Sequence, residues 1–328
     1  MAGFDILLTN LISPLVLAFA LGMIATAVKS ELEFPDGVLK FISVYLLFAI
    51  GLKGGMELSQ VQWEQVAGAI GVTVILILAI PFICFEVLRR LGKFDVPNAA
   101  ALAAHYGSVS SVTFFAALSF ANAMNTPAEG FMPALVALME WGVIVALLIA
   151  RWHMGKEARA SGETSIKELF LDSLRGRGII LLSGGMTIGF VTGEEGYGQV
   201  SPFFDEIFRG MLMLFLLEMG MAAARQMREF AKVGPFMLGF GVLMPLFLGV
   251  AGTALGTLAG LSVGGAFVLG AIAASASYID APAACRAALP TANPSIYLTS
   301  SLAITFPFNL IIGLPVYYEA AKLMAAWL

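Results

Sequence analysis

The chain has 328 residues, 59% of them hydrophobic and only 12% charged, and its formal net charge is −4. A soluble domain carries roughly a quarter charged residues, so this composition excludes a soluble globular protein and indicates one embedded in the lipid bilayer. The apolar runs are continuous over about 20 residues, which favours membrane helices over the alternating strands of a barrel. No stretch is both basic and aromatic, so nucleic-acid binding is also excluded.

The apolar runs, taken in chain order, predict an all-α membrane protein with about ten spanning helices. Charged residues, or clusters of proline and glycine, separate one run from the next. The expected limits of the spans are 11–28, 36–57, 64–90, 97–121, 130–152, 176–192, 203–225, 232–260, 262–288 and 294–326.

The most polar segment runs from Arg151 to Arg177 and divides the chain nearly in half. We therefore expect a first five-helix repeat over 1–155, a cytoplasmic linker over 156–174 and a second repeat over 175–328. Lys and Arg gather in this linker and in the other loops of the same predicted face. The positive-inside rule makes that face cytoplasmic, so both termini are expected outside, in a cell (inner) membrane.

Short motifs recur in the same order in the two halves. Gly22-Met23 recurs as Gly185-Met186, and Gly55-Met56 recurs as Gly220-Met221. One such match is weak, but several in order with a steady spacing indicate an internal repeat. Because five spans is an odd number, the second copy inserts the other way round, which predicts an inverted-topology repeat.

Polar residues interrupt the fourth and ninth spans at matching positions, in AAHYGSVSSVTFFAAL over 103–118 and LGAIAASASYIDAPAACRAAL over 269–289. Helices broken at the bilayer midplane in two inverted copies predict the binding site of a transporter. The N–H groups and dipole at a half-helix start attract an anion. Seams of small residues that pack helices are the alternative. The expected substrate-binding residues are Gly107, Ser108, Ser110, Ser111, Ser275, Ala276 and Ser277.

The candidates for binding a cation are side chains that carry oxygen, namely Thr113, Glu140, Asp280, Ser301 and Thr305. Asp280 lies beside a proline, where a helix break frees carbonyl oxygens, and this combination suits Na⁺. Glu140 has no basic residue near it in the sequence, so we expect it to bind a cation or take a proton. For Ser301 and Thr305, ordinary hydrogen bonding between helices is the alternative.

Lys53, Glu218 and His105 are further ionisable residues of the predicted spans. Lys53 and Glu218 stand at matching positions of the two halves, and we expect them either to pair with each other or to reach the interface with water. His105 lies one helical turn before the first interruption, and we expect a structural role for it.

Three stretches resemble the sodium-dependent bicarbonate transporter family first described in cyanobacteria: GSVSSVT at 107–113, IAASAS at 272–277 and ALPTANPSIYLTSSLAITFP at 288–307. The resemblance extends over the whole chain. It implies a homotrimer in which each protomer has a gate domain and a mobile core domain. It also implies an elevator-type alternating-access mechanism, with bicarbonate and Na⁺ held where the fourth and ninth spans break.

The chain departs from the cyanobacterial pattern in two places. The carboxylate after Ser277 stands two positions later, at Asp280, and the linker between the halves is shorter. These differences favour a non-cyanobacterial branch, and the short linker weakens the expectation that a PII-like regulator docks there.

The favoured function is Na⁺-coupled uptake of bicarbonate by a secondary active transporter. A Na⁺- or H⁺-coupled carrier of another small oxyanion or carboxylate stays open, as does an anion channel or sensor. The sequence has no GxSxG or HExxH motif, so we do not expect an enzyme.

Overall fold

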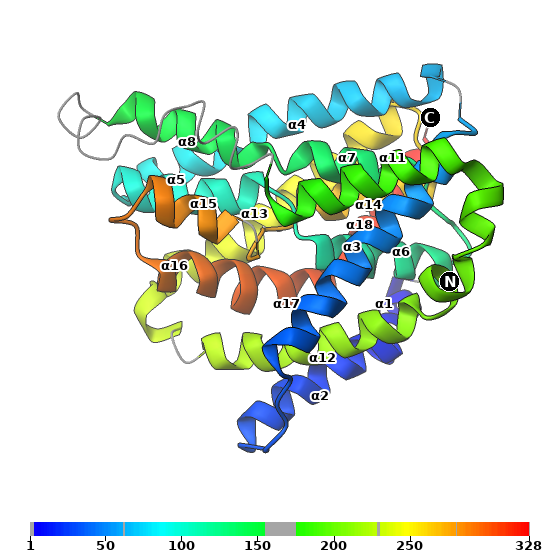
Figure 1. Ribbon diagram of the computed structural model, residues 1–328. Coiled ribbons are helices and arrows are strands. Elements are labelled where there is room, and N and C mark those ends of the chain that lie inside the picture. Colours follow the sequence, from blue (N-terminus) through cyan, green and yellow to red (C-terminus); the bar gives the residue numbers. More distant parts are fainter. Residues whose placement is uncertain (1–2, 62, 155–174, 228–229, 280, 328) are drawn as a thin grey trace.

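The computed structural model of the chain describes residues 3–61, 63–154, 175–227, 230–279 and 281–327, and every regular element in these ranges is a helix (Figure 1). In the first half the α-helices are α1 (Gly3–Leu11), α2 (Pro14–Ala27), α3 (Asp36–Leu58), α4 (Trp63–Arg90), α5 (Val96–Gly107), α6 (Ser111–Ala123), α7 (Met132–Met139) and α8 (Gly142–His153).

In the second half the α-helices are α11 (Arg177–Gly198), α12 (Phe208–Met227), α13 (Phe230–Leu258), α14 (Val263–Ala273), α15 (Ala281–Ala288), α16 (Pro294–Leu298), α17 (Phe306–Phe308) and α18 (Leu314–Ala325). Three π-helical segments join them: η1 (Pro202–Glu206), η2 (Thr299–Thr305) and η3 (Asn309–Gly313). The chain is thus helical without a break from α16 to α18, and π-helical turns of this kind are frequent at functional sites.

Seven helical runs of the described residues are long and apolar enough to cross a membrane. The helices Pro14–Ala27 and Val263–Ala273 are apolar but shorter. The fold therefore agrees with the predicted all-α membrane protein, while the count of ten spans stays a prediction. The runs are 36–58, 66–90, 96–123, 132–153, 202–227, 234–258 and 294–325.

Four helices, α2, α3, α11 and α12, pack in close pairs and are called the four-helix unit below. A Cβ atom at Gly22 of α2 would lie 1.9 Å from the carbonyl oxygen of Leu217 in α12. A Cβ atom at Gly55 of α3 would lie 2.0 Å from the carbonyl oxygen of Met186 in α11. Only glycine permits such a close approach of two backbones, and small residues of this kind pack membrane helices.

The remaining long helices, α4, α5, α6, α8, α13, α14 and α18, form what we call the inner unit. Here α4 packs on α5, α13 on α14, α5 on α8 and α14 on α18. The segments 99–117 and 264–278 are buried along their whole length. The most deeply buried part of the molecule therefore contains both serine-rich stretches.

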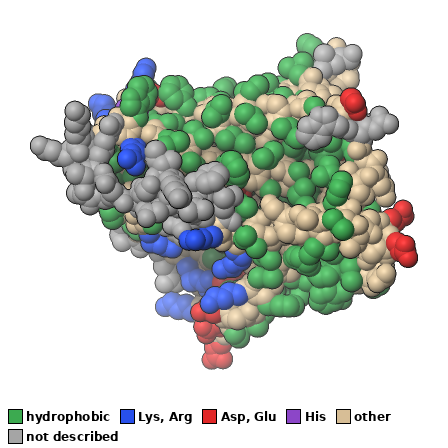
Figure 2. Space-filling view, turned by 45° about the horizontal axis from the view of Figure 1, so that its top comes forward, with side chains coloured by type: hydrophobic (Ala, Val, Ile, Leu, Met, Phe, Trp, Pro, Cys, Tyr) green, Lys and Arg blue, Asp and Glu red, His purple; other side chains and the backbone are tan. Residues whose placement is uncertain are grey.

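Charged side chains are distributed unevenly over the surface. On the face seen in Figure 2, most Lys and Arg side chains gather at one end, next to the residues drawn in grey. Most Asp and Glu side chains of this view lie at the opposite end, apart from an acidic group at the lower tip.

Candidate functional site

The two serine-rich stretches leave the helical conformation where they meet. Helix α5 ends at Gly107 and α6 begins at Ser111, with Ser108 in an extended conformation (φ −92°, ψ −178°). Helix α14 ends at Ala273 and α15 begins at Ala281. Ser110 precedes α6 and accepts a hydrogen bond from the Thr113 N–H at 3.2 Å, as an N-cap serine does.

A backbone N–H group of each non-helical stretch donates a hydrogen bond to the other half of the chain. The Ser110 N–H donates to the Ser275 hydroxyl at 2.9 Å, and this hydroxyl donates in turn to the Ile272 carbonyl at 2.7 Å. On the other side, the Ser277 N–H donates directly to the His105 carbonyl at 2.7 Å. Ser110 and Ser277 hold matching positions in the two halves, so each interruption is tied to the helix that precedes the other.

A polar side chain from a neighbouring span fixes each interruption. The Ser108 hydroxyl donates to Glu140 Oε2 at 2.7 Å, from the turn between α7 and α8. Asn309 Nδ2, at the start of η3, donates to the Ala274 carbonyl at 2.8 Å. The Tyr317 hydroxyl donates to Asn309 Oδ1 at 2.9 Å, which orients the amide.

Helix α8 approaches the first interruption more closely than any side chain would allow. A Cβ atom at Gly142 would lie 1.8 Å from the Gly107 carbonyl oxygen, and one at Gly107 would lie 2.4 Å from Pro81 Cγ. The sequence-based prediction included Gly107 but missed Gly142, because a glycine two residues after Glu140 has no distinctive pattern of its own.

The place where the two non-helical stretches meet is called the crossing below. Some hydrogen-bonding groups there have no partner in the described part of the chain and could bind a ligand. The N–H groups of Ser111 and Val112, the first of α6, have no acceptor among the described residues. The Thr113 hydroxyl and His105 Nε2 are buried without a hydrogen-bond partner among the described residues of the same part of the chain. Buried polar groups are normally satisfied, so this set marks a place where a bound ion or water would fit.

His105 otherwise has the surroundings of a structural residue, as expected. Its ring nitrogen Nδ1 is 2.7 Å from the Ala101 carbonyl, and the ring stacks on Tyr297 with 4.4 Å between centroids. A bond to Ala101 requires that Nδ1 carries the proton, so Nε2 is the acceptor.

The structure brings some predicted residues together and leaves others apart. Ser108, Ser110, Ser275 and Ser277 lie at the crossing, with Gly107, Ser111 and Ala276 next to them in the chain. Thr305 donates to the Gly241 carbonyl at 2.8 Å and bonds to the Tyr106 hydroxyl at 2.6 Å, so it reaches the first interruption only through Tyr106.

One cation candidate, Ser301, gains no support from its contacts. The Ser301 hydroxyl donates to the Tyr297 carbonyl one turn earlier in its own helix, at 2.8 Å. This bond is the ordinary back-bonding of a serine in a membrane helix. Asp280 lies outside the residues that the structure describes.

Of the two expectations for Lys53 and Glu218, pairing with each other is wrong. Lys53 Nζ is 2.8 Å from Asp205 Oδ1 in η1, and Glu218 Oε1 is 2.5 Å from Arg225 Nη2 on α12. The Lys53 side chain is partly exposed, which agrees with the other expectation, that it reaches the interface with water.

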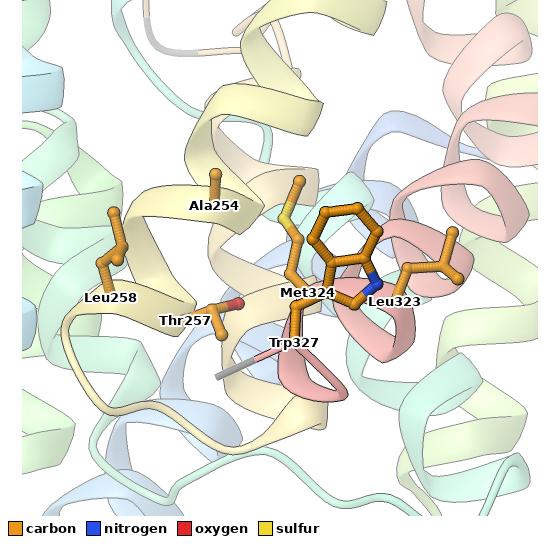
Figure 3. A pocket seen from close by; sticks show the side chains of 6 residues that line it. All are labelled: Ala254, Thr257, Leu258, Leu323, Met324 and Trp327. Carbon is orange, nitrogen blue, oxygen red and sulfur yellow. The ribbon is translucent and has the colours of Figure 1, made fainter.

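The large cavities given below do not coincide with the crossing. A cavity of about 400 Å³ lies at the ends of α13 and α18, lined by apolar side chains and Thr257 (Figure 3). None of the predicted site residues lines it. A cavity beside Ser111 and Ile279, next to the crossing, holds about 10 Å³. The candidate site is therefore defined here by the hydrogen bonds of the described residues.

A comparison with known protein families agrees with this geometry. The sequence profile of the Na⁺-dependent bicarbonate transporter superfamily matches residues 14–322, which include both interruptions. Its description names a transporter, which implies a multi-pass membrane protein that is not an enzyme. A search of curated proteins gave no match. Because the match covers nearly the whole chain, the chain belongs to the Na⁺-dependent bicarbonate transporter superfamily.

Proposed function

We propose that this chain couples Na⁺ influx to the uptake of bicarbonate, and that the anion is held where the two interruptions cross. The observation that carries the proposal is the pair of backbone contacts of Ser110 and Ser277. These contacts join the two interruptions, and the N–H groups of Ser111 and Val112 at the positive end of α6 support an anion site beside them. A monovalent oxyanion can accept such bonds without a full countercharge.

The inverted repeat, with its interruptions at the bilayer midplane, belongs to the same proposal, and the packing supports it. The motif at Gly22 contacts the one at Gly220, while the motif at Gly55 contacts the one at Gly185. Exchanging the two halves turns the first contact into the second. In the inner unit, the same exchange turns the pair α4–α5 into α13–α14, and α5–α8 into α14–α18.

The direction of two helices supports the odd number of spans per repeat. Gly185 of α11 lies against 48–52 of α3, and Gly189 lies against 52–56, so the two helices run parallel. Three candidate spans lie between them in the chain, at 66–90, 96–123 and 132–153. An odd number between two parallel helices is what the ten-span topology requires.

For Na⁺ we propose ligands close to the anion, where each charge stabilises the other. The Thr113 hydroxyl is buried at the crossing and lacks a hydrogen-bond partner among the described residues. Asp280 follows Ser277 in the chain and supplies the carboxylate in our proposal. Glu140, which holds Ser108, is the second carboxylate at the crossing. Hard cations such as Na⁺ prefer oxygen ligands of these kinds.

The wider assembly follows the family resemblance. We propose elevator-type movement of the inner unit against the four-helix unit, in a homotrimer of the inner membrane with both termini outside. The charge distribution in Figure 2, with basic residues at one end, supports that orientation. The linker at 156–174, where a PII-like regulator would dock, lies outside the described residues.

The test is uptake of labelled bicarbonate into vesicles that contain the purified protein, with and without an inward Na⁺ gradient. We expect saturable uptake that requires Na⁺ and counterflow against unlabelled bicarbonate. Uptake driven by a proton gradient alone, or preference for another oxyanion, would replace Na⁺ or bicarbonate in the proposal. Flux without saturation or counterflow would indicate a channel instead.

A further inference from the structure

Two arginines of the four-helix unit lie beside α6, one near each of its ends. Arg177, the first residue of α11, lines the cavity of about 10 Å³ together with Ser111 and Ile279. Arg209, near the start of α12, lines two cavities of about 300 and 350 Å³ together with Ser119 of α6. The boundary between the two units is thus hollowed at both ends of α6, with one arginine at each.

Neither guanidinium forms an ion pair within the described part of the chain. Among the described residues that line the small cavity at Arg177 there is no carboxylate, and the other polar side chains are the hydroxyls of Ser43 and Ser111. The described lining of the 300 Å³ cavity at Arg209 contains no carboxylate either. Each arginine therefore presents a positive charge to a space from which α6 can be reached.

The 350 Å³ cavity on the other side of Arg209 is different, because it is lined by charges of both signs. Lys53 pairs with Asp205 there, and Glu129 Oε1 accepts from the Ser262 N–H at 2.6 Å. An acidic cavity concentrates cations, so this side suits Na⁺. Its charged lining residues are Lys53, Glu57, Glu129, Asp205, Glu206 and Arg209.

Aromatic side chains close the boundary between the two ends of α6. Phe115 of α6 packs edge-to-face on Phe208 of α12, with 5.8 Å between ring centroids. Phe215 of α12 is buried and lines the cavity at Arg177 together with Phe115. These aromatic side chains separate the cavity at Arg177 from the cavities at Arg209.

Both arginines lie on helices of the four-helix unit that pack closely on their neighbours. Helix α11 is locked to α3 where Gly55 meets Met186, and α12 is locked to α2 where Gly22 meets Leu217. Helix α6, in contrast, packs on α14 of the inner unit. A movement of the inner unit therefore carries α6 past two arginines that stay in place.

We propose that Arg177 and Arg209 are specificity-determining residues for the anion. The site at Ser111 lies next to Arg177 in the conformation described, and next to Arg209 after the inner unit has moved. The inference rests on the proposed function and adds to it the two residues that receive and release the substrate. In this structure Ser119 lines the same cavities as Arg209. Between Ser111 and Ser119, α6 rises about 12 Å at 1.5 Å per residue. A displacement of that size brings the site from one arginine to the other.

The chemistry of the side chain fits the substrate. Bicarbonate has a planar carboxylate group, and the guanidinium fork can donate two parallel hydrogen bonds to it. A lysine supplies the charge without the fork. The neutral amide of glutamine removes the charge and retains polarity and much of the size.

The test uses the full-length protein in vesicles of known orientation, and measures half-saturation for bicarbonate presented from each side. Arg209→Gln should raise half-saturation on the side of the N-terminus about tenfold, the effect of one strong charge-assisted contact, and leave the other side unchanged. Arg177→Gln should do the reverse. The Na⁺ concentration for half-maximal uptake should stay within about twofold in both variants. Arg→Lys variants should fall between glutamine and wild type.

Matched controls remove a positive charge from each end without touching the cavities. Arg175→Gln changes a residue two positions before Arg177, and Lys322→Gln changes a residue of α18 that pairs with Glu319. Both controls should transport like wild type. If the arginine variants retain wild-type half-saturation on both sides, or change it equally on both, the inference is wrong and the proposed function stands. A wild-type protein without Na⁺-driven uptake contradicts the proposed function itself.

Discussion

The two interruptions differ in how tightly the structure holds them. The first spans only Ser108 to Ser110, and it is fixed at both ends by Glu140 and Ser275 and pressed from one side by Gly142. The second includes the described residues Ala274 to Ile279, and it is held at the Ala274 carbonyl, the Ser275 hydroxyl and both the N–H and the hydroxyl of Ser277. The comparison indicates a short half of the site that is packed tightly against α8 and a longer half that is held by hydrogen bonds.

The side chains that hold the two interruptions also differ in charge. Glu140 accepts a hydrogen bond from a side chain, whereas Asn309 donates one to a backbone carbonyl. An amide has the same charge at every ordinary pH, but a carboxylate can gain or lose a proton. The residue that fixes the first interruption can therefore respond to a proton or a cation, whereas the residue that fixes the second cannot.

The largest effect is expected where the two interruptions touch. Ser110→Leu and Ser277→Leu should each abolish bicarbonate uptake, because either side chain is almost fully buried and a leucine would occupy the space of the anion. Uptake into vesicles measures the effect, and the elution profile in detergent confirms that the variants fold. If only one of the two variants loses activity, the two halves contribute unequally to the site.

Ser183→Leu is the matched control for both variants. Ser183 is exposed on α11, where a leucine would face lipid, so uptake should equal that of wild type. Normal uptake by well-folded Ser110→Leu and Ser277→Leu proteins would remove both serines from the proposed site.

A second prediction concerns how tightly the first interruption is packed. Gly142→Ala would place a Cβ atom 1.8 Å from a backbone carbonyl that cannot yield, so we expect the free energy of unfolding to fall by about 3 kcal/mol. At the second interruption, Gly252→Ala would meet the Ala273 side chain at 2.7 Å and should lower it by about 1 kcal/mol. Unfolding by denaturant in detergent measures both.

Gly71→Ala provides the reference, since a Cβ atom there meets nothing within 4 Å. In the helix interior this change should be neutral or stabilise by about 0.5 kcal/mol. An equal loss of stability in Gly142→Ala and Gly252→Ala would contradict the view that the first interruption is the more tightly packed one.

The smallest effects are expected from the two carboxylates, which separate cation binding from proton binding. Asp280→Asn should raise the Na⁺ concentration for half-maximal uptake about tenfold, the loss of about 1.4 kcal/mol of binding. Glu140→Gln keeps an oxygen that can accept from Ser108 and removes the group that can be protonated, so it should mainly change the pH dependence of uptake. Initial rates over a range of Na⁺ concentrations and pH values measure both.

The opposite assignment would be equally clear in these data. If Glu140→Gln raises the Na⁺ requirement and Asp280→Asn leaves it unchanged, the cation is bound at the first interruption. Hydroxyl and carbonyl oxygens around Thr113 would then complete its coordination.

The sequence by itself determined the class of protein and the approximate position of the site. In lipid no water is available to backbone N–H and C=O groups, and a helix satisfies all of them within one continuous apolar run. Serines clustered with glycine in the middle of such runs indicated where the helices end, and α5 does end at Gly107 and α14 at Ala273. The local propensities of these residues are sufficient for that inference.

Only the tertiary structure decided which residues complete the site. Ser108 and Glu140 are far apart in the chain, as are Ala274 and Asn309, and a hydrogen bond between them depends on how the spans pack. The same is true of Gly142, whose close approach to Gly107 has no local signature, and of Lys53, whose partner is Asp205. Local preferences follow from neighbouring residues, whereas these contacts depend on the packing of the whole chain.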